Sequence, residues 1–395
     1  MIDQPMPVGL YIHIPWCVKK CPYCDFNSHE VNASSGRGQS LSTELQATYL
    51  DCLRRDLGVE VVRWQTLRAA NNDCDKPEVQ SIFIGGGTPS LCDPDFYDEL
   101  LYDIRRKLDL HADAEITLEA NPGTADSGFF RGYRQAGINR LSMGVQSFND
   151  ASLLKLGRIH NSDDVRRAFA MAREAGFQNI NLDIMHGLPD QSVAEAMTDL
   201  QSAVDMRPEH LSWYQLTIEK NTAFYSKPPL IPQDRTLADI ESGGFELLAK
   251  NGYEQYEVSA FALDDTRCLH NLNYWGFGDY LAIGAGAHGK ITGSDSVFRR
   301  WKTRTPKDYM SSEDFLAGEQ SVPAEELALE FLMNALRLND GFTKSAFERR
   351  TGIQFESIQK TIDELEVSAL LTQSEAHVSL TPLGFRFIDE ILSRF

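Results

Sequence analysis

Three cysteines near the N-terminus have the spacing of a loop that holds an iron–sulfur cluster. Cys17, Cys21 and Cys24 follow a short apolar segment in the pattern C-x₃-C-x₂-C. Thiolates are the soft ligands that such clusters prefer, and a 4Fe-4S cube usually takes four of them. No fourth cysteine completes the run, so one iron would stay open to a small-molecule ligand. A zinc site is the alternative, but it needs a second ligand pair, and neither Cys-x₂-Cys nor His-x₃₋₅-His recurs downstream.

The length and charge of the chain limit the classes of protein to which it can belong. Its 395 residues suffice for one large domain and a smaller one. No apolar run approaches the roughly 20 residues that span a bilayer, and the N-terminal segment lacks the pattern of a signal peptide. We expect a cytoplasmic protein that is not integral to a membrane, and seven cysteines without a disulfide-like pattern fit a reducing compartment. The formal net charge of −19 argues against nucleic acid as a partner.

Strand patterns alternate with helix patterns over the first half of the chain. Short β-branched segments lie at residues 10–14, 81–84, 115–119, 140–145, 179–184 and 210–216. Amphipathic segments with helical spacing lie between them, at residues 41–68, 94–108, 165–175 and 193–204. Strands separated by helices predict a parallel sheet, and six such units favour an incomplete (β/α)₆ barrel of the TIM type over an open sheet.

Residues that could do chemistry come at the carboxyl ends of the predicted strands. The cysteine loop follows the first strand, and the run Gly85-Gly-Gly-Thr-Pro89 follows the second. The next three strands end at or near Glu119, Gln146 and Asp183. Because the carboxyl ends of parallel strands meet at one rim, we expect a single site there.

An amino-acid ligand would suit the polar groups at this rim. The glycine run lacks the Lys-Ser/Thr of a phosphate loop, but it offers backbone that a ligand can approach closely. Glu119 could hold an ammonium group and Arg158 a carboxylate, while Asp183 or Gln146 could accept hydrogen bonds from a ribose diol. Taken singly, each of these residues is more typical of a salt bridge or a helix cap.

The alternation of strands and helices stops near residue 305. Helical patterns at residues 324–336, 344–350 and 355–365 precede short β-like segments at 370–372 and 377–380 and a last helix at 382–394. We therefore expect a barrel domain over residues 1–304 and a small C-terminal helical domain of winged-helix type over residues 305–395. Its acidity argues against DNA binding, so we interpret it as a lid or docking domain.

These motifs give the chain a resemblance to a known family. The cysteine run, with an aromatic residue before its last cysteine, and the Gly-Gly-Gly-Thr-Pro segment resemble those of radical S-adenosylmethionine proteins. Longer stretches at residues 11–17, 82–89, 141–148 and 181–189 resemble the oxygen-independent coproporphyrinogen oxidases and the related HemW heme chaperones. The resemblance spans nearly the whole chain, including the C-terminal domain.

The resemblance implies two cofactors and their contacts. The open iron of a 4Fe-4S cluster would bind the amine and carboxylate of S-adenosylmethionine, and an electron passed to the sulfonium would yield methionine and a 5′-deoxyadenosyl radical. The positions that match the family's S-adenosylmethionine contacts are Tyr11, Gly86, Gly87, Thr88, Glu119, Gln146, Arg158 and Asp183.

Two local features favour the heme chaperone branch of this group. The oxidases carry a further cysteine two residues after the third cluster cysteine, where this chain has Phe26. The run that starts at His270 also matches the H-N-x-x-Y-W signature associated with heme binding in the HemW branch. Its members are His270, Asn271, Tyr274 and Trp275. An imidazole can ligate heme iron, and Tyr and Trp offer flat apolar surface; without the resemblance, a histidine beside aromatic residues is more typical of a core.

A glycine-rich run follows the H-N-x-x-Y-W signature, at residues 276–289. It does not open an amphipathic helix as a dinucleotide-binding fingerprint would. We expect it to close the barrel beneath the cofactor, and we regard His288 within it as a weaker candidate for a heme ligand.

Three functions stay open on the sequence. The favoured one is a heme chaperone that retains the radical S-adenosylmethionine core, binds heme and passes it to recipient proteins, either in solution or at a membrane. The alternative is an oxygen-independent coproporphyrinogen III oxidase, which converts propionates to vinyl groups, and the third is a radical enzyme with another substrate. The sequence does not decide whether S-adenosylmethionine is cleaved, and the cluster loop or the heme motif could pair two copies in a homodimer.

Overall fold

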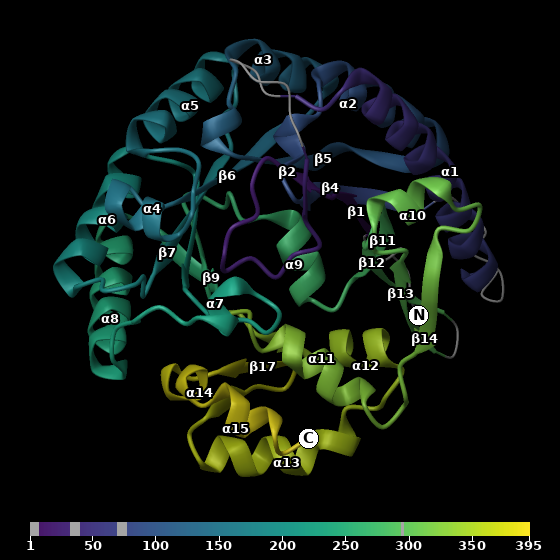
Figure 1. Ribbon diagram of the computed structural model, residues 1–395. Coiled ribbons are helices and arrows are strands. Elements are labelled where there is room, and N and C mark those ends of the chain that lie inside the picture. Colours follow the sequence, from purple (N-terminus) through teal and green to yellow (C-terminus); the bar gives the residue numbers. More distant parts are fainter. Residues whose placement is uncertain (1–7, 32–39, 69–76, 294–295) are drawn as a thin grey trace.

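The computed structural model describes residues 8–31, 40–68, 77–293 and 296–395. In this part of the chain a twelve-stranded sheet curls into an open barrel with helices on its outer face (Figure 1). Its central strands are parallel: β1 (Val8–Ile14), β4 (Glu78–Gly86), β5 (Asp109–Ala120), β6 (Arg140–Gln146), β7 (Ile180–His186) and β8 (His210–Gln215). Each overlaps a predicted strand, so the incomplete (β/α)₆ barrel is confirmed.

Helices cover the outer face of these strands. They are α1 (Thr43–Arg68), α2 (Pro94–Lys107), α3 (Ser127–Ala136), α4 (Asp150–Lys155), α5 (Ser162–Glu174), α6 (Val193–Asp205) and α8 (Asp234–Lys250). The short helix α7 (Ala223–Ser226) lies instead against the cysteine loop, where the Phe224 amide donates to the carbonyl of Pro22 at 2.9 Å. Capping boxes at Asn161 and Ser192 begin α5 and α6, since each side chain accepts a hydrogen bond from the backbone three residues later. Short 3₁₀ turns, η2 (Pro89–Leu91) and η3 (Pro122–Thr124), follow β4 and β5.

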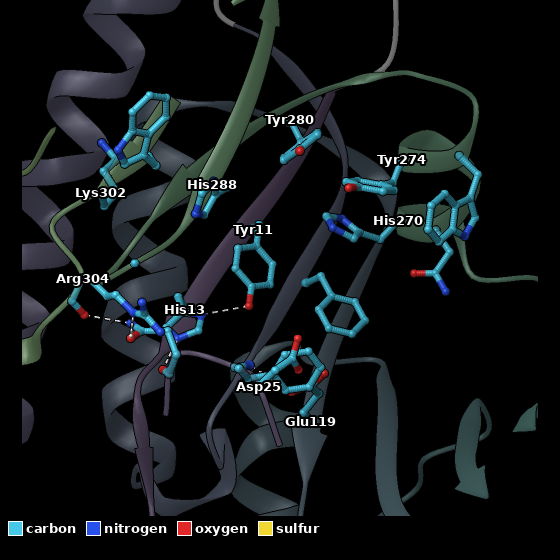
Figure 2. Close-up of a pocket in the computed structure, with 18 residues that line it drawn as sticks. Tyr11, His13, Asp25, Glu119, His270, Tyr274, Tyr280, His288, Lys302 and Arg304 are labelled. Atoms are coloured by element: carbon cyan, nitrogen blue, oxygen red, sulfur yellow. Dashed lines mark hydrogen bonds between the residues drawn. The ribbon is translucent and has the colours of Figure 1, made fainter. Parts of the chain in front are cut away.

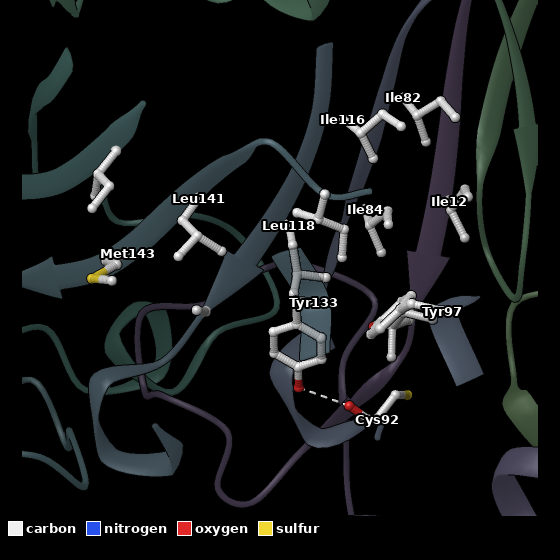
Figure 3. Close-up of a cluster of buried hydrophobic side chains, with 14 of the residues drawn as sticks. Ile12, Ile82, Ile84, Cys92, Tyr97, Ile116, Leu118, Tyr133, Leu141 and Met143 are labelled. Atoms are coloured by element: carbon white, nitrogen blue, oxygen red, sulfur yellow. Dashed lines mark hydrogen bonds between the residues drawn. The ribbon is translucent and has the colours of Figure 1, made fainter. Parts of the chain in front are cut away.

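Alternation along each strand separates the core from the interior of the barrel. Ile12, Ile84, Leu118 and Leu141 point outward and pack with Tyr97 and Tyr133 of the helix layer (Figure 3). The residues between them, Tyr11 on β1 and Glu119 on β5 among them, are inward and partly open. The fold therefore buries its apolar side chains under the helices and leaves the polar ones for the hollow of the barrel.

The sheet extends past the parallel strands at both edges. Beyond β8 come the antiparallel strands β10 (Ala260–Ala262) and β9 (Glu254–Glu257). Beyond β1 come the parallel strand β11 (Asp279–Ile283) and the antiparallel strands β12 (His288–Thr292), β13 (Val297–Lys302) and β14 (Leu316–Ser321). Helix α9 (Leu269–Trp275) lies in the hollow of the barrel, and α10 (Pro306–Ser311) lies beside α1 (Figure 1).

The prediction that residues 276–289 close the barrel beneath the cofactor is wrong. This run forms β11, which pairs with β1 on the edge away from β8. In the described residues the outermost strands of the sheet, β14 and β9, are not paired with each other. Small residues here admit the chain next to β1: a Cβ on Gly284 would lie 2.4 Å from the carbonyl oxygen of His13.

The C-terminal domain has a second hydrophobic core, built around Phe331 and Phe347, to which Phe277 and Val297 of the barrel domain also contribute. It consists of α11 (Leu327–Ala335), β15 (Phe342–Thr343), α12 (Lys344–Thr351), α13 (Glu356–Val367), β16 (Leu371–Gln373), β17 (His377–Leu380), α14 (Pro382–Arg386) and α15 (Ile388–Leu392). The predicted single helix over 382–394 is wrong, because Phe387 leaves the helical conformation (φ −122°) and separates α14 from α15. Since β14 pairs with β13, we propose that the domain division predicted at 304/305 lies between residues 321 and 322.

Among the described helices, none is both long and apolar enough to cross a membrane.

Candidate functional site

Two adjoining cavities lie inside the barrel. The smaller, about 150 Å³, is lined by the three motif cysteines and is here called the cysteine cavity. The larger, about 640 Å³, is lined by His13, His270 and His288 and is here called the histidine cavity. The two share Phe26, Gly86 and Glu119 in their walls, so they are neighbours across a thin partition.

The cysteine loop lies between two short parallel strands, β2 (Trp16–Cys17) and β3 (His29–Glu30). The Thr88 hydroxyl donates to the sulfur of Cys17 at 3.5 Å, and an Nη of Arg158 donates to the sulfur of Cys21 at 3.7 Å. Burial raises the pKa of the Cys17 and Cys24 thiols. A positively charged metal group at the cavity would reverse this effect, because it favours the thiolate form.

The three sulfurs fit a cluster better than a single metal ion. In the described part of the chain, no group of three or more His, Cys, Asp or Glu side chains is gathered closely enough to hold one ion. A 4Fe-4S cube binds each thiolate at a different iron, so its ligands are spread around a larger object. Cys17, Cys21 and Cys24 line one cavity in this way, as the spacing predicts.

The glycine run lies directly against the cysteine loop. The Gly87 amide donates to the carbonyl of Ile14 at 2.7 Å, and the Thr88 amide donates to the carbonyl of Trp16 at 2.7 Å. A Cβ on Gly87 would lie 2.5 Å from that Trp16 oxygen, and Gly86 has a φ of +114° that other residues rarely adopt. These glycines therefore allow two backbone segments to meet at the floor of the cysteine cavity.

Two buried carboxyl groups lie beside this floor. Glu119 accepts a hydrogen bond from the Gly86 amide at 3.0 Å, and burial, with the neighbouring charge of Asp183, raises the pKa of Glu119 to about 8. Asp183 accepts hydrogen bonds from Ser142 at 3.1 Å and Asn181 at 2.8 Å, while burial raises its pKa. A cationic group of a ligand would be stabilised next to this pair.

A strained turn places the other polar groups of the cavity. Gln146 has a φ of +69° beside an irregularity in the pairing of β6 with β7, and its side-chain oxygen accepts from the Tyr214 hydroxyl at 2.8 Å. Arg158 donates to the carbonyl of Gly144 at 2.5 Å. The Nε of Arg158 is buried without a hydrogen-bond partner in the described structure, which suits a guanidinium that awaits a carboxylate.

Seven of the eight predicted S-adenosylmethionine contacts line the cysteine cavity together with the cysteines. They are Gly86, Gly87, Thr88, Glu119, Gln146, Arg158 and Asp183. The eighth, Tyr11, lines the histidine cavity instead, where its hydroxyl is 2.9 Å from Nδ1 of His13. The buried arginine, the acidic pair and the open backbone fit the carboxylate and the positive charge of this cofactor.

The predicted heme motif lies on α9, and all four of its named residues line the histidine cavity: His270, Asn271, Tyr274 and Trp275 (Figure 2). The imidazole of His270 stacks on Phe83 with ring centroids 5.2 Å apart, and its Nδ1 is 3.3 Å from the Ser81 hydroxyl. Burial lowers the pKa of His270 to about 4, so the ring is neutral at physiological pH. Neutral imidazole is the form that ligates iron.

A buried carboxylate holds the start of α9. Glu115 on β5 accepts hydrogen bonds from the backbone amides of Leu269 at 3.1 Å and His270 at 3.3 Å. Arg140 lies 3.8 Å from the same carboxylate and is also buried. Glu115, on the polar inward side of the barrel, thus fixes the helix that carries the imidazole. This role was not predicted from the sequence. The signal available for it was the alternation of polar and apolar residues within the strands.

The wall that faces α9 was also missed, except for His288. It comes from β12, β13 and the loop that follows, and its members are His288, Trp301, Lys302 and Arg304. His288 and Trp301 are stacked with ring centroids 6.4 Å apart. The concentration of aromatic and basic residues in β13, which reads VFRRWK, was the signal for this wall in the sequence.

Comparisons with known proteins identify the family of the chain. The model of the radical SAM superfamily matches residues 11–201, and that of the HemN C-terminal domain matches residues 322–387. The chain is 45% identical over 396 residues to "Heme chaperone HemW" of Escherichia coli (strain K12), which covers 100% of this chain and 99% of that protein. The HemW of Haemophilus influenzae is 44% identical over 98% of both chains.

A solved structure shows the same fold. Coproporphyrinogen III oxidase (HemN) from Escherichia coli superposes with a TM-score of 0.76 and 22% identity, over 98% of this chain and 90% of that chain. At this identity the likeness concerns the fold alone. The full-length sequence identity is more specific, and by it the chain belongs to the HemW family of radical S-adenosylmethionine proteins.

Proposed function

We propose that this protein is a heme chaperone, which binds heme in the histidine cavity and passes it to recipient proteins. The observation that carries the proposal is the buried, neutral imidazole of His270 in the wall of a cavity of about 640 Å³. This volume lies within the range of roughly 300–1,000 Å³ that is usual for ligand sites. The full-length relatives are named heme chaperones, which supports the same function.

The side chains around His270 suit a flat macrocycle. Tyr11, Phe83, Tyr274 and Tyr280 all line the cavity and offer ring faces and edges. Because Nδ1 of His270 lies against Ser81, Nε2 is the nitrogen left for an iron atom. Asn271 and Trp275 complete the same wall.

In this proposal the cysteine cavity holds a 4Fe-4S cluster on Cys17, Cys21 and Cys24, with S-adenosylmethionine beside it. When bound, the cluster would supply the electron for reductive cleavage of the sulfonium. The chain's own part is to hold the ligand's carboxylate at Arg158, to place Glu119 and Asp183 near its positive charge, and to exclude water from the floor.

The oxidase alternative has less support. Phe26, at the position where the oxidases carry a further cysteine, is 61% exposed and contributes no thiol to either cavity. The match to the oxidase is one of fold, whereas the matches to heme chaperones extend over full sequences.

We also propose that the protein works in the cytoplasm, where reduced thiols can hold the cluster. Recipients at the membrane and a homodimer stay predictions of the sequence.

The first test is a heme titration of the His270→Ala variant beside the wild type, both purified anaerobically and followed by the Soret absorbance. We expect the variant to lose the ligation spectrum and to bind heme more weakly, with unchanged iron and sulfide content. His377→Ala in the C-terminal domain is the control. Unchanged heme binding by His270→Ala would remove this residue from the site.

A turnover assay separates the chaperone from the oxidase. The reconstituted protein is incubated anaerobically with S-adenosylmethionine, a low-potential reductant and coproporphyrinogen. We expect no protoporphyrinogen. Formation of protoporphyrinogen together with 5′-deoxyadenosine would make the protein an oxidase.

A further inference from the structure

Two basic residues, Lys302 and Arg304, line the histidine cavity. They differ in whether a carboxylate already pairs with their charge. The Nζ of Lys302 donates to Glu60 at 2.6 Å and also to Asp56, and all three side chains are buried. Its charge is therefore already compensated. Arg304 is exposed, and no carboxylate of the described residues lies within ion-pair distance of it. Of the two, Arg304 alone has a charge available to a ligand.

Arg304 is held at the edge of the cavity from one side only. Its Nε donates to the side-chain oxygen of Asn27 at 3.3 Å. Asn27 in turn donates to the carbonyls of Arg304 at 2.8 Å and Ala285 at 2.9 Å, so its amide is fixed by two segments of backbone. This arrangement restrains the arginine and leaves its terminal Nη groups to a partner outside the chain.

The arginine lies across the cavity from the proposed iron ligand. In Figure 2, Arg304 is at one side, His270 and Tyr274 are at the other, and Tyr11 stands between them. Between these two ends the cavity is lined mainly by aromatic rings. A ligand that spans it would place an apolar body against the rings and an acidic edge at the arginine.

Heme has such a shape, since it is a flat apolar ring with two carboxylates on one edge. We infer that Arg304 binds a propionate carboxylate of the porphyrin and thereby sets the orientation of heme in the histidine cavity. The inference rests on the proposed function and names a specificity-determining residue outside the H-N-x-x-Y-W motif. A guanidinium–carboxylate pair can form two parallel hydrogen bonds, which a lysine cannot reproduce.

The charges near Arg304 agree with this orientation. Burial and the positive charges of Arg299 and Arg304 lower the pKa of His288 in the ligand-free protein, and the negative charge of a propionate at Arg304 would counteract the effect of those two arginines. The cavity carboxyl groups, Asp25 and Glu119, lie away from Arg304 (Figure 2). The acidic edge of the ligand therefore meets its most favourable surroundings at the end formed by β13.

The test compares heme with heme dimethyl ester, in which both carboxylates are masked. Both ligands are titrated into the anaerobically purified full-length protein, into Arg304→Gln and into Arg304→Lys. We expect the wild type to prefer heme about tenfold or more, the usual effect of one charge-assisted hydrogen-bonded pair. Arg304→Gln should lose most of this preference and Arg304→Lys should keep part of it, while Arg394→Gln, at an exposed position in the C-terminal domain, should match the wild type.

The outcomes separate the inference from the proposed function. If the wild type binds heme and the ester equally, or if Arg304→Gln keeps the full preference, the inference is overturned and the chaperone proposal stands. If the wild type binds neither ligand, both are overturned. Circular dichroism shows whether each variant is folded, and the second substitution at Arg304 decides the matter if the first is not.

Discussion

Glu119 gives the sharpest prediction about the ligand-free protein, because folding makes the ionisation of this side chain costly. Burial and the charge of Asp183 raise its pKa from 4.5 to about 8. A carboxyl group with a raised pKa in the folded state contributes its full stability below pH 4.5, and this stability is lost as the pH rises toward 8. We therefore expect Glu119→Gln, which keeps the shape and an acceptor oxygen for Gly86, to stabilise the ligand-free protein at neutral and alkaline pH.

The magnitude follows from the linkage between protonation and folding. Each unit of pKa shift corresponds to about 1.4 kcal/mol. At pH 7 the free energy of unfolding of the wild type should therefore be lower than that of Glu119→Gln by at most about 3 kcal/mol. The side chain borders both cavities, and water that reaches it there reduces this figure. The difference should be below about 1 kcal/mol at pH 5, should grow with pH, and should level off above pH 8.

The assay is urea unfolding of cluster-free protein under anaerobic reducing conditions, in buffers from pH 5 to 8.5. Glu195→Gln is the matched control, since Glu195 is exposed at the start of α6 and hydrogen bonds from Ser192 lower its pKa. The control difference should not change over this range. A difference for Glu119→Gln that is equally flat, or one that shrinks as the pH rises, would refute the reasoning.

Two further predictions concern the cluster and the support of the heme motif. Cys21→Ala should abolish a stable 4Fe-4S cluster, while Cys52→Ala, at a buried cysteine outside both cavities, should leave iron and sulfide content unchanged; a full cluster in Cys21→Ala would contradict the cluster assignment. Glu115→Ala should lower the free energy of unfolding by about 3 kcal/mol, because it leaves the buried Arg140 unpaired and removes the acceptor for the first amides of α9, and it should weaken heme binding at temperatures where the variant is folded. Thermal unfolding and heme titration measure both effects, and a variant as stable as the wild type would contradict the assigned contacts.

The parallel strands and their rim could be predicted from the sequence because the information is local. Most of these strands contain a short apolar run with a polar residue at or near the carboxyl end, such as Glu119 in β5 or Gln146 in β6, and parallel strands bring such ends to one edge. The cysteine cavity contains this set together with the cysteine loop. The rule that parallel strands place their carboxyl ends at one edge was enough to predict a single site there, without knowledge of any individual contact.

The far wall of the histidine cavity could not be predicted in this way. It depends on the pairing of β1 with β11, in which Val8 lies beside Asp279. Such a pairing between distant segments leaves no local pattern. The strands β12 to β14 are antiparallel and have only the short helix α10 among them, so the alternation of parallel strands with long helices does not reveal them. Arg304 lines the cavity because it follows β13, which joins the sheet through β12 and β11.

The partition between the cavities connects the two proposed sites electrostatically. In the ligand-free protein the raised pKa of Glu119 favours its protonated form at neutral pH, which contributes no charge to either cavity. A cationic ligand in the cysteine cavity would favour the ionised form, which places a negative charge on the wall that the histidine cavity shares. The acidic edge of a porphyrin would then be repelled from Glu119 toward Arg304, the same orientation that the free guanidinium favours. One carboxyl group could thus make the position of heme depend on whether the neighbouring cavity is occupied.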